Sequence, residues 1–386
     1  LIDMKDLIVK KKIIINLTED WFFVSHFLGR AIDAKKAGYE VYISCNEKKS
    51  RKYIEGNGIK FFSLPLDRRG TNPIYEFYIL LKYFYIFKKV KPDIVHNIGP
   101  KPIIYGSIIA KLLKIKSVIN APIGMGFVFT SASMKAKLLK QFLLFLFGFT
   151  LNNHHGKNKN NRVIFENSDD MNFFINAKLV RLKEAILIRG AGIEIDEKII
   201  KKEKKNKIIK IALVARMLKD KGIYEYVEAA RILKNKKIKC RFLLIGDIDK
   251  KNPTSLEKSI LEEWNSQEII EWLGWVDNVK EILLKTDILC LPSYREGLPK
   301  SLLEGAAVGL PLVTCDTVGC REVVQDGVNG YLVPIKESKK LALAMQKLIE
   351  SRELRVSMGK ESFRIAKSQF SSEIINSQTI SIYDEL

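Results

Sequence analysis

Cysteine and histidine are scarce in this sequence, and no long apolar run is present. Five cysteines and four histidines stand among 386 residues, and neither a C-x-x-C pair nor an H-E-x-x-H motif occurs. Such an odd, scattered set predicts buried free thiols in a reducing compartment and no structural zinc site. The most apolar stretch, residues 142–149, is far shorter than the ~20 residues of a membrane-spanning helix. The apolar run at 13–15 is too short for the core of a signal peptide.

The two common glycine-rich phosphate-binding motifs are also missing. Gly124 and Gly126 could begin a G-x-G-x-x-G motif, but Val128 and Phe129 follow them. No G-x-x-x-x-G-K-[ST] occurs. These absences disfavour dinucleotide-dependent dehydrogenases and P-loop NTPases, because each uses its motif to bring backbone amides to phosphate.

Acidic residues are few relative to basic ones. Lys and Arg number 65 and Asp and Glu 44, which gives a formal net charge of +21. Residues 1–200 carry 33 basic and 18 acidic side chains, and the remainder carries 32 and 26. Residues 101–150 contain seven lysines and no acid. A basic first half predicts an anionic partner: nucleic acid, a phospholipid surface or a phosphorylated substrate.

Apolar residues are abundant, at 47% of the chain, which is enough for two or three domains with large cores. That content excludes a disordered or collagen-like chain. Strand-length apolar runs alternate with helix-like segments, and the runs are near-continuous, as in buried parallel strands. Expected strands in the first half are 12–17, 40–45, 60–64, 93–97, 117–121 and 162–166, and expected helices are 24–37, 73–89 and 104–113.

A charged run at residues 201–207 has the composition of a linker. A second α/β series follows it. Its expected strands are 208–215, 241–246, 269–273, 288–291 and 311–314, and its expected helices are 224–234, 256–264, 279–285, 300–308 and two at the C-terminus. The predicted fold class is therefore α/β, with two doubly wound parallel-sheet domains joined by one linker.

Two cations lie where open parallel sheets bind ligands. Arg216 and Lys221 follow the expected strand 208–215, and Gly222 allows the backbone to turn into the next helix. An Arg fork and a Lys point charge beside a helix N-terminus suit a diphosphate. In so lysine-rich a chain, the alternative that both side chains simply reach solvent stays open.

Two glutamates follow another strand. Glu296 lies on the loop after the expected strand 288–291, and Glu304 lies in the helix that Pro299 begins. A loop carboxylate at this edge can accept hydrogen bonds from sugar hydroxyls, and a helix carboxylate from ribose hydroxyls. The amides of 297–301 can meet phosphate or sugar oxygens. The spacing of the two glutamates alone arises often by chance.

Several motifs, taken in order, resemble those of the retaining GT-B glycosyltransferases of family 4. Over residues 208–335 these are ARMLKDKG at 215–222, FLLIGD at 242–247, LGW at 273–275, SYREGLPKSLLE at 293–304, VGCRE at 318–322 and DGVNG at 326–330. The first half is similar to a bacterial surface-polysaccharide subgroup through EDWFFVSH at 19–26, DIVH at 93–96, KPIIYG at 101–106 and GMGFVF at 124–129.

This resemblance implies a GT-B fold, in which two Rossmann-like domains face a cleft. Residues 1–200 would bind the acceptor, with 371–386 crossing back to them, and 207–365 would bind the nucleotide-sugar donor. The implied reaction is retaining, hexosyltransferase-type transfer without a metal or other cofactor, since built-in cations would neutralise the leaving diphosphate. The D-x-D formed by Asp247 and Asp249 is accordingly interpreted as a crevice loop and not a manganese site.

The resemblance also implies the roles of individual residues. The catalytic residues would be Arg216, Lys221, Glu296 and His96. The donor-binding set would be Arg216, Lys221, Gly246, Glu296, Gly297, Leu298, Pro299, Lys300, Ser301 and Glu304, and the acceptor-binding set Glu19, His26, Lys101, Gly124 and Gly126. The alternative for His96 is a structural role in the crevice wall, and for His26 capping or packing. The family's usual Gly-Gly in the first loop is absent, and residues 17–20 read LTED there.

The expected partners are a nucleotide-sugar donor (UDP first, GDP as the alternative), a polyprenyl-diphosphate-linked saccharide acceptor of O-antigen or capsule biosynthesis, and an anionic membrane. Lys135, Lys137 and Lys140 precede the apolar run 142–147, and residues 73–92 combine aromatics with lysines. These features favour a cytoplasmic protein bound peripherally at the inner face of the cell membrane. Packing of the aromatics in the core is the alternative. Nucleic acid is not an expected partner, since no helix-turn-helix, RRM or zinc-finger signature appears.

Two other functions of the same fold stay open, a nucleotide-sugar epimerase and a catalytically inactive sugar-binding partner subunit. The presence of Arg216, Lys221, Glu296 and Glu304 together disfavours an inactive subunit. A glycogen-type phosphorylase is not expected, because those chains run far longer and carry a lysine-bound pyridoxal cofactor.

Overall fold

The computed structural model describes residues 10–67, 70–123, 134–151, 160–199, 208–250 and 252–386, without the side chains of Lys135, Ala136 and Ile199. The chain forms two compact units, the first of residues 1–191 with 375–386 and the second of residues 192–374. The division at 191/192 precedes the charged run 201–207, which lies outside the described residues. Within the described ranges, no helix is both long and apolar enough to span a membrane.

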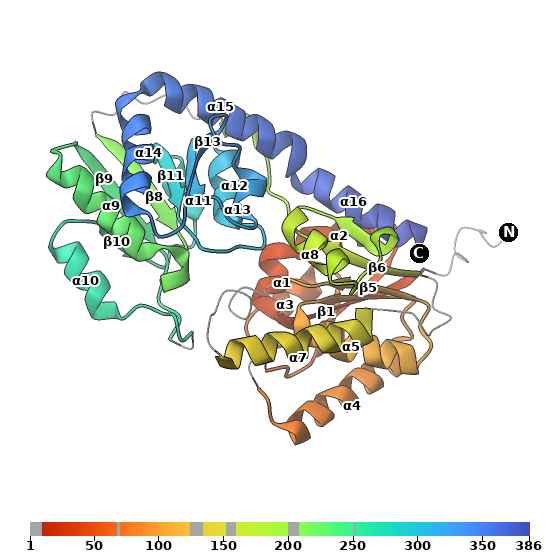
Figure 1. Cartoon of the computed structure of the whole chain (residues 1–386). Coiled ribbons are helices and arrows are strands. Elements are labelled where there is room, and N and C mark those ends of the chain that lie inside the picture. Colours follow the sequence, from red (N-terminus) through yellow and green to blue (C-terminus); the bar gives the residue numbers. More distant parts are fainter. Residues whose placement is uncertain (1–9, 68–69, 124–133, 152–159, 200–207, 251) are drawn as a thin grey trace. The chain divides into compact units, whose positions relative to one another are not determined.

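The first unit is built on a seven-stranded sheet with the strand order β3-β2-β1-β4-β5-β6-β7 (Figure 1). All neighbouring strands are parallel. The strands are β1 (Lys12–Glu19), β2 (Glu40–Asn46), β3 (Lys60–Ser63), β4 (Ile94–Ile98), β5 (Ser117–Ala121), β6 (Asn160–Phe165) and β7 (Ala185–Leu187). The order reverses between β1 and β4, as in doubly wound sheets.

Helices cover both faces of this sheet, because successive residues of each strand point to opposite sides and both sets are apolar. On one face Ile14 and Val95 pack under α4 (Pro73–Val90) and α5 (Pro100–Leu112), and Val163 and Phe165 of β6 pack under α7 (Met134–Leu151) and α8 (Ser168–Asn176). On the other face Ile13 and Ile94 pack under α1 (Asp20–His26), α2 (Leu28–Lys36), α3 (Arg51–Gly56) and α16 (Ser372–Glu385). The residues of α16 from Ile375 onward belong to the first unit, where Asn376 Nδ2 donates to Asp33 Oδ2 at 2.8 Å.

The second unit has a six-stranded sheet with the order β10-β9-β8-β11-β12-β13, again all parallel. The strands are β8 (Ile209–Val214), β9 (Cys240–Ile245), β10 (Glu271–Gly274), β11 (Ile288–Leu291), β12 (Leu312–Cys315) and β13 (Gly330–Val333). The helices are α9 (Ile223–Asn235), α10 (Lys258–Ser266), α11 (Val279–Leu283), α12 (Lys300–Ala307), α13 (Cys320–Val323), α14 (Ser338–Glu350) and α15 (Arg352–Gln369). One continuous core of buried side chains joins sheet and helices, and the strand order reverses between β8 and β11.

The predicted α/β class with two parallel sheets is confirmed, and four of the five cysteines are buried free thiols, with Cys240 partly exposed.

Several element predictions are wrong. The helix expected at 24–37 is two helices that meet at Phe27, and β1 runs directly into α1, so residues 17–20 form no loop. Strands β7 and β13 were not predicted, because three or four residues carry too little pattern and pairing with β6 and β12 defines them. Three helices, not two, close the chain.

Candidate functional site

Charged side chains gather at the carboxyl edge of the second sheet, where the strand order reverses. Arg216 follows β8, Asp249 follows β9, and Glu296 follows β11. The carboxyl ends of parallel strands on either side of such a reversal form the usual ligand-binding crevice of open α/β sheets. The structure therefore brings together residues that are 80 positions apart in sequence at the place expected for a ligand.

Lys221 forms an ion pair with Glu296, with 2.5 Å between Nζ and Oε1. Only 18% of the Lys221 side chain is exposed. Gly222, at φ 72°, closes the turn that carries the lysine, and a Cβ on it would lie 2.1 Å from the carbonyl oxygen of Pro292. This glycine therefore lets the turn after β8 approach the loop after β11, which places the lysine beside the glutamate.

Arg216 forms a second ion pair, in which its Nη1 lies 2.8 Å from Asp249 Oδ2. Its side chain is 52% exposed, so this pair is far more solvated than the first. The segment that carries Asp249 is held against the arginine loop by backbone bonds, from Met217 N to Asp247 O at 3.0 Å and from Leu256 N to Met217 O at 2.9 Å. Asp249 of the D-x-D motif is therefore the ion-pair partner of Arg216, which the sequence pattern did not predict.

Glu304 lies in α12, one helical turn after Lys300, whose Nζ is 3.9 Å from Oε1. Burial raises the pKa of Glu304, and the Lys300 charge opposes that shift. The helix packs closely on the sheet beside Glu304, because a Cβ on Gly305 would lie 2.4 Å from Leu289 Cδ2. The helix begins at Lys300, so Pro299 is the residue before its first turn and not the first helical residue.

The loop 296–298 makes close backbone contact with the loop after β12. Glu296 N donates to the carbonyl oxygen of Val318 at 3.1 Å. A Cβ on Gly319, at φ 79°, would lie 2.4 Å from the carbonyl oxygen of Gly297. Only glycine therefore fits at position 319 without moving the loop that carries Glu296.

His96 lies in β4 of the first unit and is fully buried. Its Nδ1 is 2.8 Å from the Tyr383 hydroxyl oxygen of α16. Burial lowers the pKa of His96 to about 3, and the buried Arg30 contributes to the shift. A neutral, enclosed imidazole fits the structural alternative. The catalytic assignment of His96 stays a prediction.

The three predicted acceptor residues that the structure describes have intramolecular partners in the first unit. Glu19 ends β1, and its Oε2 is 2.8 Å from Lys48 Nζ. His26 ends α1, and its ring packs on Phe22 at a centroid distance of 4.3 Å. Lys101 donates to the carbonyl oxygens of residues 67 and 70 and to a carboxylate oxygen of Glu76. Gly124 and Gly126 lie outside the described residues.

A row of neutral polar residues, which was not predicted, crosses the first sheet under α5. Asn16 pairs in register with Ser44 and Asn97, and Asn97 pairs with Asn120. The side chains bond along this row, from Ser44 Oγ to Asn16 Oδ1 at 2.6 Å, Asn16 Nδ2 to Asn97 Oδ1 at 2.8 Å and Asn97 Nδ2 to Asn120 Oδ1 at 3.0 Å. The available signal was an Asn or Ser near the end of four successive strands.

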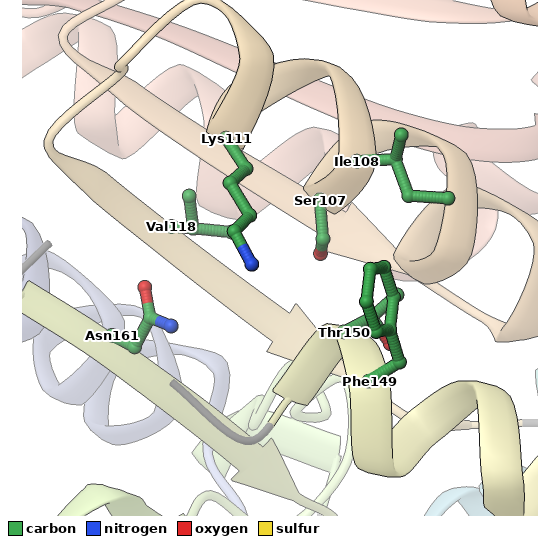
Figure 2. Close-up of a pocket in the computed structure, with 7 residues that line it drawn as sticks. All are labelled: Ser107, Ile108, Lys111, Val118, Phe149, Thr150 and Asn161. Carbon is green, nitrogen blue, oxygen red and sulfur yellow. The ribbon is translucent and has the colours of Figure 1, made fainter. Parts of the chain in front are cut away.

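The cavity in Figure 2 is a different feature of the first unit. Its volume is about 20 Å³, close to what one water needs and far too small for a nucleotide or a saccharide. It lies where α5, α7, β5 and β6 meet, and its lining residues are Ser107, Ile108, Lys111, Val118, Phe149, Thr150 and Asn161. This cavity is therefore not a substrate site.

Two family models match most of the chain. The model described as glycosyl transferases group 1 matches residues 194–364, and the model described as glycosyl transferase 4-like matches residues 12–155. The first match covers every charged residue of the crevice in the second unit.

Two relatives that match most of the chain are named as glycosyltransferases. The chain is 28% identical over 362 residues to the N,N'-diacetylbacillosaminyl-diphospho-undecaprenol alpha-1,3-N-acetylgalactosaminyltransferase of Campylobacter jejuni, covering 90% of this chain and 91% of the relative. It is 24% identical over 329 residues to the UDP-Gal:alpha-D-GlcNAc-diphosphoundecaprenol alpha-1,3-galactosyltransferase of Escherichia coli, covering 82% of each. The crystal structure of Anabaena HepE in complex with UDP and glucose matches its fold with a TM-score of 0.74 at 15% identity, covering 97% of this chain and 100% of HepE. The chain therefore belongs to the family 4 glycosyltransferases and has the GT-B fold.

Proposed function

We propose that the protein is a retaining glycosyltransferase that moves a sugar from a nucleotide sugar, first of all a UDP-sugar, to a polyprenyl-diphosphate-linked saccharide. The observation that carries the proposal is the pair of cation–carboxylate contacts, Arg216–Asp249 and Lys221–Glu296, at the strand-order reversal of the second sheet. The names of the C. jejuni and E. coli relatives, both transferases for diphospho-undecaprenol-linked sugars, support the acceptor class. The reaction would serve the assembly of a surface polysaccharide.

Arg216 and Lys221 would bind the donor diphosphate, each exchanging its carboxylate for phosphate oxygens. A charge-assisted hydrogen bond contributes about 1.5–3 kcal/mol, and more where negative charge develops on the leaving group. When the diphosphate binds Lys221, the carboxylate of Glu296 becomes available to accept hydrogen bonds from hydroxyls of the donor sugar. The cations of the chain would thus supply the charge that a metal supplies elsewhere, and we propose a metal-independent and cofactor-independent reaction.

Other side chains of the crevice would orient the donor. The carboxylate of Glu304 would accept hydrogen bonds from the ribose, and the backbone at Gly246 and of residues 297–301 would contact the donor. The acceptor hydroxyl would attack from the face of the leaving group through an oxocarbenium-like state. Such transfer needs no carboxylate nucleophile, unlike the paired carboxylates of retaining hydrolases. The acceptor would bind to the first unit, at Glu19, His26, Lys101, Gly124 and Gly126.

We also propose that the protein works at the inner face of the cell membrane as a peripheral protein. A polyprenyl-linked acceptor stays in the bilayer, so the enzyme must come to it. The seven lysines without an acid at residues 101–150 support an anionic surface as the partner.

The test is a panel of UDP- and GDP-sugars incubated with and without a polyprenyl-diphosphate-linked saccharide. We expect nucleotide release that depends on the lipid-linked acceptor, a product with the donor's anomeric configuration by NMR, and no loss of rate with a chelator. Conversion of the donor to an epimer without transfer would identify an epimerase. Donor binding without any turnover would identify an inactive partner subunit, and a rate abolished by the chelator would contradict metal independence.

A further inference from the structure

Exposed apolar side chains concentrate on one side of the first unit. Of the 23 large apolar side chains that are exposed in the described part of the chain, 13 lie on α4, α5 and α7. These 13 are Ile74, Tyr75, Phe77, Tyr78, Leu81, Tyr85, Leu112, Met134, Leu138, Leu139, Phe142, Phe145 and Phe149. The other ten are spread over the rest of both units. Patches of this kind on a soluble domain mark a binding surface.

Helix α4 is apolar on two opposite faces. Tyr83 and Phe87 point into the core and are buried. Phe77, Leu81 and Tyr85, four residues apart and therefore on one stripe of the helix, are exposed, with Phe77 and Tyr85 each at 61%. A helix apolar on all sides is found in a large core or in contact with lipid, and here the core takes only one of the two faces.

Helix α7 repeats this arrangement. Phe147 and Leu151 are buried, whereas Leu138, Phe142 and Phe145 form an outer stripe, and Phe145 is 72% exposed. Both helices pack against α5, so the three helices form one layer on one face of the sheet, as Figure 1 shows. The outer stripes of α4 and α7, together with Leu112 of α5, are called the lipid face below.

The charge of this layer has one sign. The sequences of α4, α5 and α7 contain eight lysines and a single acid, Glu76. Glu76 is directed inward, to the ammonium of Lys101 and to the Tyr105 hydroxyl at 2.6 Å. Lysine ammonium groups lie over exposed rings, with Lys82 Nζ 5.3 Å from the Tyr78 ring and Lys111 Nζ 5.2 Å from the Phe149 ring. Lysine side chains can lay their apolar stems along aromatic rings and keep the ammonium groups outside. Such pairs suit the interface between acyl chains and anionic headgroups.

We propose that the lipid face docks on, and inserts side chains into, an anionic phospholipid bilayer, with α4 contributing as much as α7. The inference rests on the proposed peripheral role and names the surface that performs it. Lysine is depleted at the core of protein–protein interfaces, so a second copy of the chain is a poorer match for this face. Nucleic acid would use the cations but leave Phe77, Leu81 and Phe145 in water.

The test is flotation with vesicles of phosphatidylcholine, with or without phosphatidylglycerol. The wild type should float with the mixed vesicles and release them as salt rises. The α4 variant Phe77→Ser/Leu81→Ser/Tyr85→Ser and the α7 variant Phe142→Ser/Phe145→Ser should each lose about tenfold or more in partitioning, since each removes inserted apolar area. The matched control is Tyr53→Ser, because Tyr53 is 60% exposed on α3, which covers the other face of the same sheet.

Thermal unfolding of both variants should match the wild type, since the substituted side chains lie outside the core. Arg216→Ala should float like the wild type, so a failure of the proposed transferase activity leaves this result intact. Flotation of the α4 variant equal to that of the wild type overturns the proposal. So does a variant-dependent change in the mass of the lipid-free protein at sedimentation equilibrium, which would make this face an interface between copies. Binding to duplex DNA that survives loss of the aromatics would assign the lysines to nucleic acid and also overturn it.

Discussion

The carboxyl ends of the strands differ between the two sheets. In the second unit the residues there are charged and paired as Lys221–Glu296 and Arg216–Asp249, and the arginine is largely exposed. In the first unit Asn16, Asn97 and Asn120 lie within β1, β4 and β5, near their carboxyl ends, and are neutral, buried and bonded along one row. Glu19, which ends β1, pairs with Lys48 of the same unit.

The difference indicates two uses of one architecture. A paired cation at a strand end can exchange its carboxylate for a ligand's phosphate, so the second unit is suited to a small anionic ligand. A buried row of amides has no such freedom. Each amide is satisfied only in one register, and a shift of one residue would bury it unpaired among apolar side chains. The first unit therefore uses this row of amides for its own fold, and the proposed lipid face lies on the outside of its helices.

The largest effect should come from removing the cations of the second unit. Arg216→Ala and Lys221→Ala should each lower turnover by about a hundredfold or more, since each deletes a group aimed at charge that develops in the transition state. Steady-state kinetics with the active donor measures the effect. Lys219→Ala is the matched control, because Lys219 is exposed on the same turn. Near-normal rates in both variants would contradict the proposal that Arg216 and Lys221 bind the donor diphosphate.

The next largest effect should come from charge reversal in the first unit, and it should reduce transfer to the lipid-linked acceptor only. Changing Lys135, Lys137 and Lys140 together to Glu should abolish binding to anionic vesicles and transfer to the lipid-linked acceptor, because each cation near such a surface contributes about 1 kcal/mol. Transfer to a short soluble acceptor should survive. A control with the same charge change is the reversal of the exposed lysines 339, 340 and 360 of the second unit. Equal losses on both acceptors would mean that the α7 lysines support the fold or the site.

Glu304→Gln should weaken donor binding by about tenfold, because an ionic acceptor to ribose becomes a neutral one. It should also raise the melting temperature at pH 7. The pKa of Glu304 is raised by burial, so the carboxylate destabilises the folded state, and this cost grows as pH rises through the folded pKa. The gain in melting temperature should vanish below the ordinary glutamate pKa of about 4.3. A variant that is less stable than the wild type at pH 7 would refute this account of Glu304.

His96→Asn tests whether the strand end of the first unit is purely structural. Burial lowers the pKa of His96 to about 3, so at mildly acidic pH the imidazole is protonated in the unfolded chain and neutral in the folded chain. Stability should therefore fall as pH drops from neutral toward 3, by roughly 2 kcal/mol between pH 7 and pH 5. Urea unfolding at the two pH values should show a flatter dependence for His96→Asn, with kcat little changed. Loss of kcat with an unchanged pH dependence of stability would favour the catalytic assignment instead.

The smallest effect should come from the partner of the exposed arginine. Asp249→Asn removes a carboxylate that competes with the diphosphate for Arg216, so UDP should bind more tightly in calorimetric titration. The gain should be about two- to fivefold, since a solvated ion pair contributes about 0.2–1 kcal/mol. Asp316→Asn, at a similarly solvated arginine pair in the same unit, is the control and should leave UDP affinity unchanged. Weaker UDP binding in Asp249→Asn would mean that Asp249 orients Arg216 rather than competing for it.

The two parallel sheets were predictable from the residues alone, and so were the position of Arg216 and Lys221 after a strand and the likeness to family 4. Each of these depends on neighbouring residues, because apolar runs define buried strands and motifs define the turns that follow them. Most strand boundaries were predicted within two residues, and the misses were short strands that long-range pairing defines.

The partner of each polar residue depends on the three-dimensional fold, and so does the choice of which apolar face is covered. Asp249 lies 33 positions after the arginine that it binds, and Tyr383 lies 287 positions after His96. On α4 the pattern of apolar residues continues around the helix, so periodicity could not separate the buried Tyr83 and Phe87 from the exposed Phe77 and Tyr85. Packing made that separation, because only one side of a helix can lie on the sheet and the opposite side faces outward whatever residues it carries.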